Sequence, residues 1–113
     1  MAIIRSFRDL RVYEQSRAEA QRIFRATKTF PPEEKYSLTD QIRRSSRAVK
    51  SMIAEAWGHR RYQASFVSKL TDAIGEANET QSWLDDALDS GYITATVHKD
   101  LDAAWQSIGG RHQ

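Results

Sequence analysis

Apolar residues recur at steps of three and four along residues 33–57, and this segment organises the rest of the chain. Its apolar positions are Leu38, Ile42, Val49, Ile53 and Ala56. Such spacing places them on one face of a helix. No Gly or Pro interrupts the segment, two prolines precede it, and Gly58 follows it. Prolines favour a helix start and glycine favours a helix end, so the sequence predicts one helix over residues 33–57.

Three other segments share this helical spacing, and they predict helices at about residues 10–27, 62–89 and 94–108. Asp9 is suited to cap the first of them. No segment alternates apolar and polar residues as a half-buried strand would. Connections of about two to five residues favour antiparallel neighbours. The sequence therefore predicts a single all-α domain over residues 1–113, an antiparallel up-and-down four-helix bundle.

Several aromatic residues bear on where the core ends. Phe24 falls on the apolar stripe of the first helix, so we expect it in the core. Phe30 directly precedes the two prolines and is expected to close one end of the core. Trp83 and Trp105 lie off the cleanest apolar stripes. Either they are half-buried on their own bundle, or they lie between subunits, where aromatic residues are enriched.

The charge of the chain is unevenly distributed, although its net value is only +2. Residues 1–61 contain 14 Lys or Arg and 7 Asp or Glu, a net +7, whereas residues 62–113 contain 3 and 8, a net −5. A basic half can bind phosphates, or it can pair with the acidic half of another copy of the chain. Both halves can also be ordinary solvated surfaces.

The basic side of the second predicted helix is the candidate binding site. Its cations, with two more just beyond the helix end, are Arg43, Arg44, Arg47, Lys50, Arg60 and Arg61. Cations clustered on a rigid element suit phosphate binding, which releases counterions. Ser45, Ser46 and Ser51 could add hydroxyl donors. As an alternative, Arg43 or Arg44 pairs across a subunit interface with an acid of the third helix, Asp85, Asp86 or Asp89.

Catalytic and metal-binding patterns are missing from the sequence. There is no Cys, no Gly-rich phosphate loop and no nucleophile elbow. His59, His98 and His112 do not show metal-ligand spacing, and the Glu-x-x-His pairs of carboxylate-bridged bundles are absent. We therefore expect no enzyme activity, no metal and no cofactor. No apolar run is long enough for a signal peptide or a membrane span, so a cytoplasmic protein is expected.

Three stretches resemble a known bacterial family: FRDLRVYEQS (residues 7–16), TFPPEEKYSLTDQIRRSS (residues 29–46) and IAEAWGHR (residues 53–60). The most specific part comprises Phe30, Pro31, residues 34–36, Leu38 and residues 41–44. The family is a four-helix bundle family that includes proteins encoded in intervening sequences of large-subunit ribosomal RNA genes. It also includes accessory variability proteins of diversity-generating retroelements. The resemblance covers about residues 7–93.

The resemblance implies a ring-shaped homo-oligomer, typically a pentamer, whose retroelement members bind nucleic acid through a basic surface and pair with a reverse transcriptase. Family members usually carry a helix-kinking Pro near the position of Lys50, an Asn at the position of Met52 and a Gly at the position of Ala56. The second helix should therefore be straighter in this chain. We expect a homo-oligomeric accessory protein that binds RNA or DNA through its basic helix face. The alternative is a protein-binding or scaffolding oligomer whose basic stripe forms subunit contacts.

Overall fold

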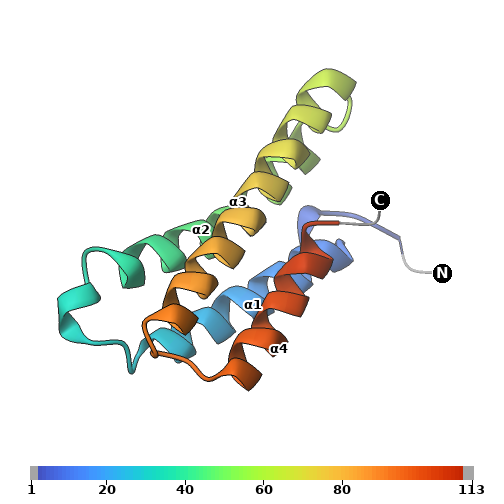
Figure 1. The fold of residues 1–113 in the computed structure, drawn as a ribbon. Helices are drawn as coiled ribbons and strands as arrows, with labels where there is room; N and C mark the ends of the chain where they lie inside the picture. Colours follow the sequence, from blue (N-terminus) through green and yellow to red (C-terminus); the bar gives the residue numbers. More distant parts are fainter. Residues whose placement is uncertain (1–2, 111–113) are drawn as a thin grey trace.

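The computed structural model describes residues 3–110 and consists of four α-helices and two short 3-10 helices. The α-helices are α1 (Arg11–Thr27), α2 (Leu38–Gly58), α3 (Gln63–Asp89) and α4 (Ala95–Ile108), and the 3-10 helices are η1 (Phe7–Asp9) and η2 (Pro32–Glu34). Successive α-helices run antiparallel (Figure 1). No strand occurs within residues 3–110. The all-α prediction and the four antiparallel helices are confirmed.

The second helix begins at Leu38, five residues later than the prolines suggested. The prolines start only the short turn η2, and the Glu34 carboxylate then holds the following chain in a turn. It accepts hydrogen bonds from the Ser37 hydroxyl at 2.6 Å and from the Tyr92 hydroxyl at 2.7 Å. These two bonds, Ser37 first, lower the pKa of Glu34, and the bond to Glu34 raises the pKa of Tyr92.

The first helix begins at Arg11, within one residue of the prediction, but its capping differs from the prediction. Asp9 does not cap α1 but closes η1, where its carboxylate accepts the backbone N–H groups of Arg5 and Ser6. Ser6 accepts the N–H of Arg8 in return, which completes a reciprocal capping box. The N-cap of α1 is Leu10, which offers no side-chain oxygen. Asp9 was therefore assigned to α1, whereas its side chain caps the preceding element, η1.

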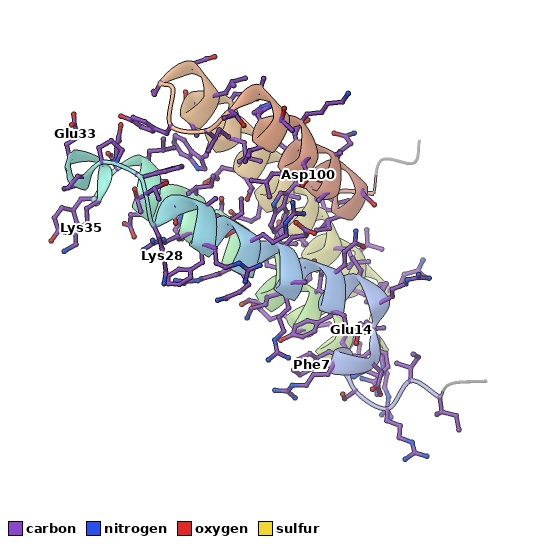
Figure 2. The ribbon with its side chains drawn as sticks, turned by 90° about the horizontal axis from the view of Figure 1, so that it is seen from below. Phe7, Glu14, Lys28, Glu33, Lys35 and Asp100 are labelled. Carbon is purple, nitrogen blue, oxygen red and sulfur yellow. The ribbon has the colours of Figure 1, made fainter. Side chains whose placement is uncertain are left out.

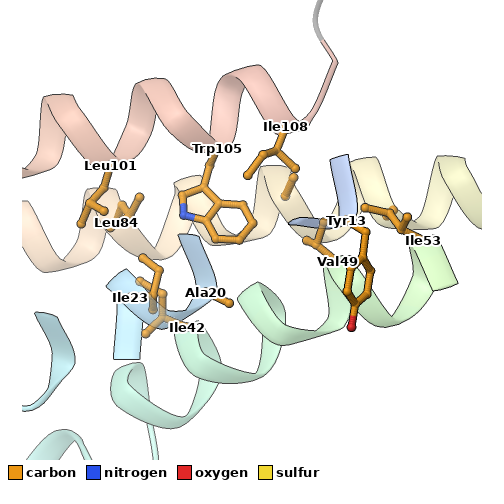
Figure 3. Packing of buried hydrophobic residues seen from close by; sticks show 12 residues of the cluster. Tyr13, Ala20, Ile23, Ile42, Val49, Ile53, Leu84, Leu101, Trp105 and Ile108 are labelled. Carbon is orange, nitrogen blue, oxygen red and sulfur yellow. The ribbon is translucent and has the colours of Figure 1, made fainter. Parts of the chain in front are cut away.

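The main core lies between all four helices (Figure 3). Trp105 of α4 is 0% exposed and lies among side chains of the other helices, so the expectation of a half-buried or intersubunit Trp105 was wrong. Trp83 is half-buried, and its indole N–H donates to Glu79 at 3.1 Å. Phe30 is buried with Leu38 and Ala87 in a second cluster, which confirms that it closes one end of the core.

A buried polar pair joins α2 to α3 inside this core. The hydroxyls of Ser45 and Thr80, both on residues that are 0% exposed, lie 2.8 Å apart. Thr80 also bonds to the Glu76 carbonyl at 3.0 Å, whereas the second contact of Ser45, to the Ile42 carbonyl, is longer at 3.4 Å. A buried hydroxyl needs such partners because water cannot reach it.

The hairpin of α2 and α3 extends past the ends of α1 and α4 (Figure 1). We call residues 54–69 of this hairpin the arm, and Ala56 is its one buried residue. Tyr62 and Val67 on the arm are 70% and 51% exposed. Where the arm leaves the bundle, a groove of about 260 Å³ opens among mostly apolar residues, including Val12, Leu70 and Ile74. The arm therefore presents apolar surface that residues 3–110 do not cover.

Candidate nucleic-acid interface

Three cations from two helices surround the ring of Phe24. The Arg43 guanidinium carbon lies 4.7 Å from the ring centroid, that of Arg47 lies 5.5 Å away, and the Lys28 ammonium lies 5.0 Å away. Phe24 and Lys28 come from α1 and its C-terminal end, while the arginines come from α2, which packs against α1. Cations are attracted to the negative face of an aromatic ring, which offsets part of their mutual repulsion.

Arg43 is held in place by a further contact. Its Nε donates to the Thr27 hydroxyl at 2.8 Å, and that hydroxyl donates in turn to the Phe24 carbonyl at 2.9 Å. Thr27 is only 3% exposed, so this chain of bonds is largely shielded from water. Nε is the one Arg43 donor bonded within residues 3–110, and the terminal guanidinium nitrogens make no bond there. The planar donor fork is thus fixed over the ring and can still bind an oxyanion.

Arg47 and Lys50 continue the same helix face, because they follow Arg43 at steps of four and three. Arg47 is exposed and Lys50 is half-buried. We call Lys28, Arg43, Arg47 and Lys50 the basic patch. In Figure 2, Lys28 lies at one end of α1, on the side away from Asp100. No ion pair within the described part of the chain neutralises any member of the patch.

Arg44 does not belong to this patch, although it neighbours Arg43 in sequence. It faces α3 and forms ion pairs with Glu76, at 3.4 Å, and with Glu79. These acids are in the same chain and differ from the three aspartates considered as intersubunit partners. Because both carboxylates already compensate its charge, Arg44 has less to offer a phosphate than the members of the patch.

Arg60 and Arg61 lie apart from the patch, at the tip of the arm. Arg60 donates to the Trp57 carbonyl at 2.9 Å, and its guanidinium carbon lies 4.1 Å from the centroid of the Trp57 ring. Arg61 and Tyr62 beside it are exposed. At 1.5 Å per residue, the last residue of α2, Gly58, is about 16 Å along the helix from Arg47, and Arg60 follows in the turn beyond it. The six predicted cations therefore form three groups rather than one continuous surface.

The three serines proposed as extra phosphate donors differ in their exposure to solvent. Ser45 and Ser46 are 0% exposed, so neither can reach a ligand, and this part of the prediction was wrong. Ser51 is exposed, and its hydroxyl donates to the Arg47 carbonyl at 3.3 Å.

Sequence reasoning missed Phe24 and Lys28 as members of the site. Phe24 was placed in the core because it falls on an apolar stripe, but it is half-buried, at the edge between α1 and α2. The available signal was its spacing of four from Lys28, which puts a cation beside the ring on a helix. That α1 supplies Phe24 and Lys28 to the site could not be predicted without knowing which face of α2 packs against α1.

Comparisons with known proteins agree on a family and a fold. The sequence pattern of the family described as 23S rRNA-intervening sequence protein matches residues 8–111. A solved structure of a protein with unknown function from the S23 ribosomal protein family of Bacteroides thetaiotaomicron is 31% identical, with a TM-score of 0.77. That match covers 87% of this chain and 88% of the other. A search of curated proteins found no match. No helix within residues 3–110 is long and apolar enough to cross a membrane.

Proposed function

We propose, on the premise that this chain belongs to the 23S rRNA-intervening sequence protein family, that it is a non-enzymatic accessory protein that binds RNA or DNA through its basic patch. The observation that carries the proposal is the group of cations around Phe24. Lys28, Arg43 and Arg47 converge on one ring, and no acid of the described chain pairs with them. Such uncompensated charge on rigid helices attracts a polyanion.

Binding through this patch depends on charge and shape. Arg43 supplies an oriented donor fork, whereas Arg47 and Lys50 supply charge on the next turns of the same helix face. Contacts to phosphates position a protein on nucleic acid but carry no sequence information by themselves. We therefore propose recognition of backbone geometry, with Arg60 and Arg61, beyond the C-terminal end of α2, as a second contact.

The test is fluorescence anisotropy of a structured RNA and a DNA duplex titrated with protein at several salt concentrations. The informative variant is Lys28→Ala/Arg47→Ala/Lys50→Ala, which spares Arg43 because its bond to Thr27 helps to hold α1 on α2. Each phosphate contact contributes about 0.9 to the salt slope on duplex DNA and about 0.7 on single strands. The variant should therefore lose about two to three units of slope.

A matched control removes three exposed cations that lie outside the basic patch. Arg5→Ala/Arg11→Ala/Lys99→Ala changes the net charge by the same amount and should leave the salt slope nearly unchanged. An unchanged slope in the patch variant, or an equal loss in the control, would show that the patch is not the site.

We also propose that the protein assembles with itself, as a ring of five subunits. The exposed Tyr62 and Val67 on the arm, together with Ile74 at 43% exposure beside the groove, form a surface suited to a second copy. The opposite net charges of the two chain halves favour the same contact. Light scattering after size-exclusion chromatography should give five times 13.0 kDa, and Val67→Ser/Ile74→Ser should reduce this mass with helicity retained. A monomeric wild type, or an unchanged mass in the variant, would contradict the assembly.

A ring would bring five basic patches together and extend the surface available to a polyanion. We propose a retroelement reverse transcriptase as a further protein partner, and a gene for such an enzyme beside this one would support the pairing.

The second candidate is a scaffold whose basic patch forms the subunit contact, and the net charge of −5 on residues 62–113 favours it because a second copy could supply acidic partners. Arg47→Glu separates the two candidates, since Arg47 is exposed and makes no ion pair within the described residues. Under the first proposal the ring stays intact and nucleic-acid binding weakens. Under the second the ring dissociates. Arg43→Glu would be less informative because it also breaks the bond to Thr27.

A further inference from the structure

Asp85, His98 and Asp102 come together on the side of the molecule formed by α3 and α4. One potential ligand atom from each residue lies within 4.8 Å of the other two. His98 Nε2 and Asp85 Oδ1 are 2.8 Å apart. The His98 side chain is 18% exposed and that of Asp85 is 66% exposed, while Asp102 is half-buried. A small cation could therefore enter from solvent and meet a partly preformed set of donors.

The helical geometry explains how these three residues meet. His98 and Asp102 are four residues apart on α4, so their side chains lie one above the other on the same face. Asp85 comes from α3, which runs antiparallel beside α4 after a short connection. The group contains no histidine pair and no Glu-x-x-His motif, because here a single imidazole joins two aspartates, so its spacing along the sequence does not reveal it.

Two further observations favour a cation at this place. Gln81 Nε2 donates to Asp102 Oδ1 at 3.1 Å and to Gln106 Oε1 at 2.8 Å, and such outer contacts orient a ligating carboxylate. In addition, no Lys or Arg within residues 3–110 forms an ion pair with Asp85 or Asp102. Within residues 3–110 the fold thus gathers two carboxylates beside an imidazole, and His98 is the one side chain there that can pair with Asp85 as a cation.

We propose that Asp85, His98 and Asp102 bind a zinc ion that ties α3 to α4. Imidazole nitrogen and carboxylate oxygen are both ordinary zinc ligands, whereas calcium and magnesium prefer oxygen alone. Zinc would replace the His98–Asp85 hydrogen bond, and three protein ligands leave a fourth position for water. Such an ion stabilises the pairing of the last two helices. This inference is independent of nucleic-acid binding, because the basic patch belongs to α1 and α2.

The test is isothermal titration of the full chain with Zn²⁺. The reference protein is His59→Ala/His112→Ala, which leaves His98 as its single histidine and so removes imidazoles elsewhere, including His112, which lies outside the described residues. We expect this reference protein to bind one zinc per chain. At a hundredfold excess of zinc over the dissociation constant, its thermal midpoint should rise by about 10 °C.

Variants then identify the ligands. Adding His98→Ala or Asp102→Asn to the reference protein should weaken binding by at least about tenfold, and Gln81→Ala, which only positions Asp102, by roughly tenfold. Asp72→Asn removes an exposed carboxylate elsewhere on α3 and should bind as the reference does. Circular dichroism checks that each variant is folded. No zinc binding by the reference protein, or undiminished binding by a folded His98→Ala variant, would overturn the proposal.

Discussion

The buried hydroxyl pair between α2 and α3 offers a quantitative test of the interior. Ser45→Ala and Thr80→Val each remove one hydroxyl from residues that are 0% exposed, with little change in side-chain volume. The double variant removes both hydroxyls and leaves an apolar contact in their place. Because each single variant deprives one buried group of its partner, the two substitutions should not be additive.

The hydrogen-bond distances predict which single variant is the more costly. After Ser45→Ala, Thr80 keeps its bond to the Glu76 carbonyl at 3.0 Å, so the loss is about one net hydrogen bond, about 1 kcal/mol. After Thr80→Val, Ser45 keeps only its 3.4 Å contact with the Ile42 carbonyl. That hydroxyl is close to unsatisfied, and we expect a cost of about 2 kcal/mol. The double variant should be more stable than the sum predicts by about 1 kcal/mol.

Urea unfolding followed by circular dichroism measures these differences. All proteins must be compared at one concentration, because self-association would make the midpoint concentration-dependent. Equal m values would show that the same surface is exposed in each case. Ser51→Ala is the control, since Ser51 is exposed and should cost almost nothing. Additivity within about 0.3 kcal/mol, or a Ser45→Ala variant less stable than Thr80→Val, would refute the reasoning.

Four further predictions concern two glycines, the turn at Glu34 and the surface. Gly91 has φ +77°, so Gly91→Ala should lower the free energy of unfolding by about 1 kcal/mol. Gly75 lies inside α3, where an added Cβ meets nothing within 4 Å, so Gly75→Ala should raise the free energy of unfolding by about 0.5 to 1 kcal/mol. The same urea assay measures both. The lowered pKa of Glu34 stabilises the fold at neutral pH, and this contribution is lost as the pH falls through that pKa; thermal midpoints of wild type and Tyr92→Phe should therefore converge in acid. Arg44→Ala should change stability by less than about 1 kcal/mol and leave the salt slope of nucleic-acid binding intact, as urea and anisotropy titrations can check.

Much of the fold follows from the sequence because long helices leave a strong periodic signal. The apolar stripe of α2 needs no tertiary information. Its five predicted members are all buried: Leu38, Ile42, Val49, Ile53 and Ala56. Helix starts are less well determined, since the turn at Glu34 depends on Tyr92, which is 58 residues away in the chain. Trp105 illustrates the same limit. The apolar stripe of α4 alone does not show whether the other helices leave enough room to bury a tryptophan.

The candidate site was predictable only on the helix that supplies most of it. Steps of four and three place Arg43, Arg47 and Lys50 on one face, and the structure agrees. The exclusion of Arg44 required knowing that Glu76 and Glu79 of α3 lie beside it. Pairing between helices, rather than spacing along one of them, decides which cations keep their charge available.

The arm also determines where the backbone opens most easily. Its helical turns have one buried residue, Ala56, so little apolar burial opposes their local unfolding, and its amides should exchange with solvent faster than those beside Ile42. If a second copy covers the arm, these amides become protected only above the concentration at which the copies associate. The length of ordered helix in α2 and α3 would then report how much of the protein is assembled.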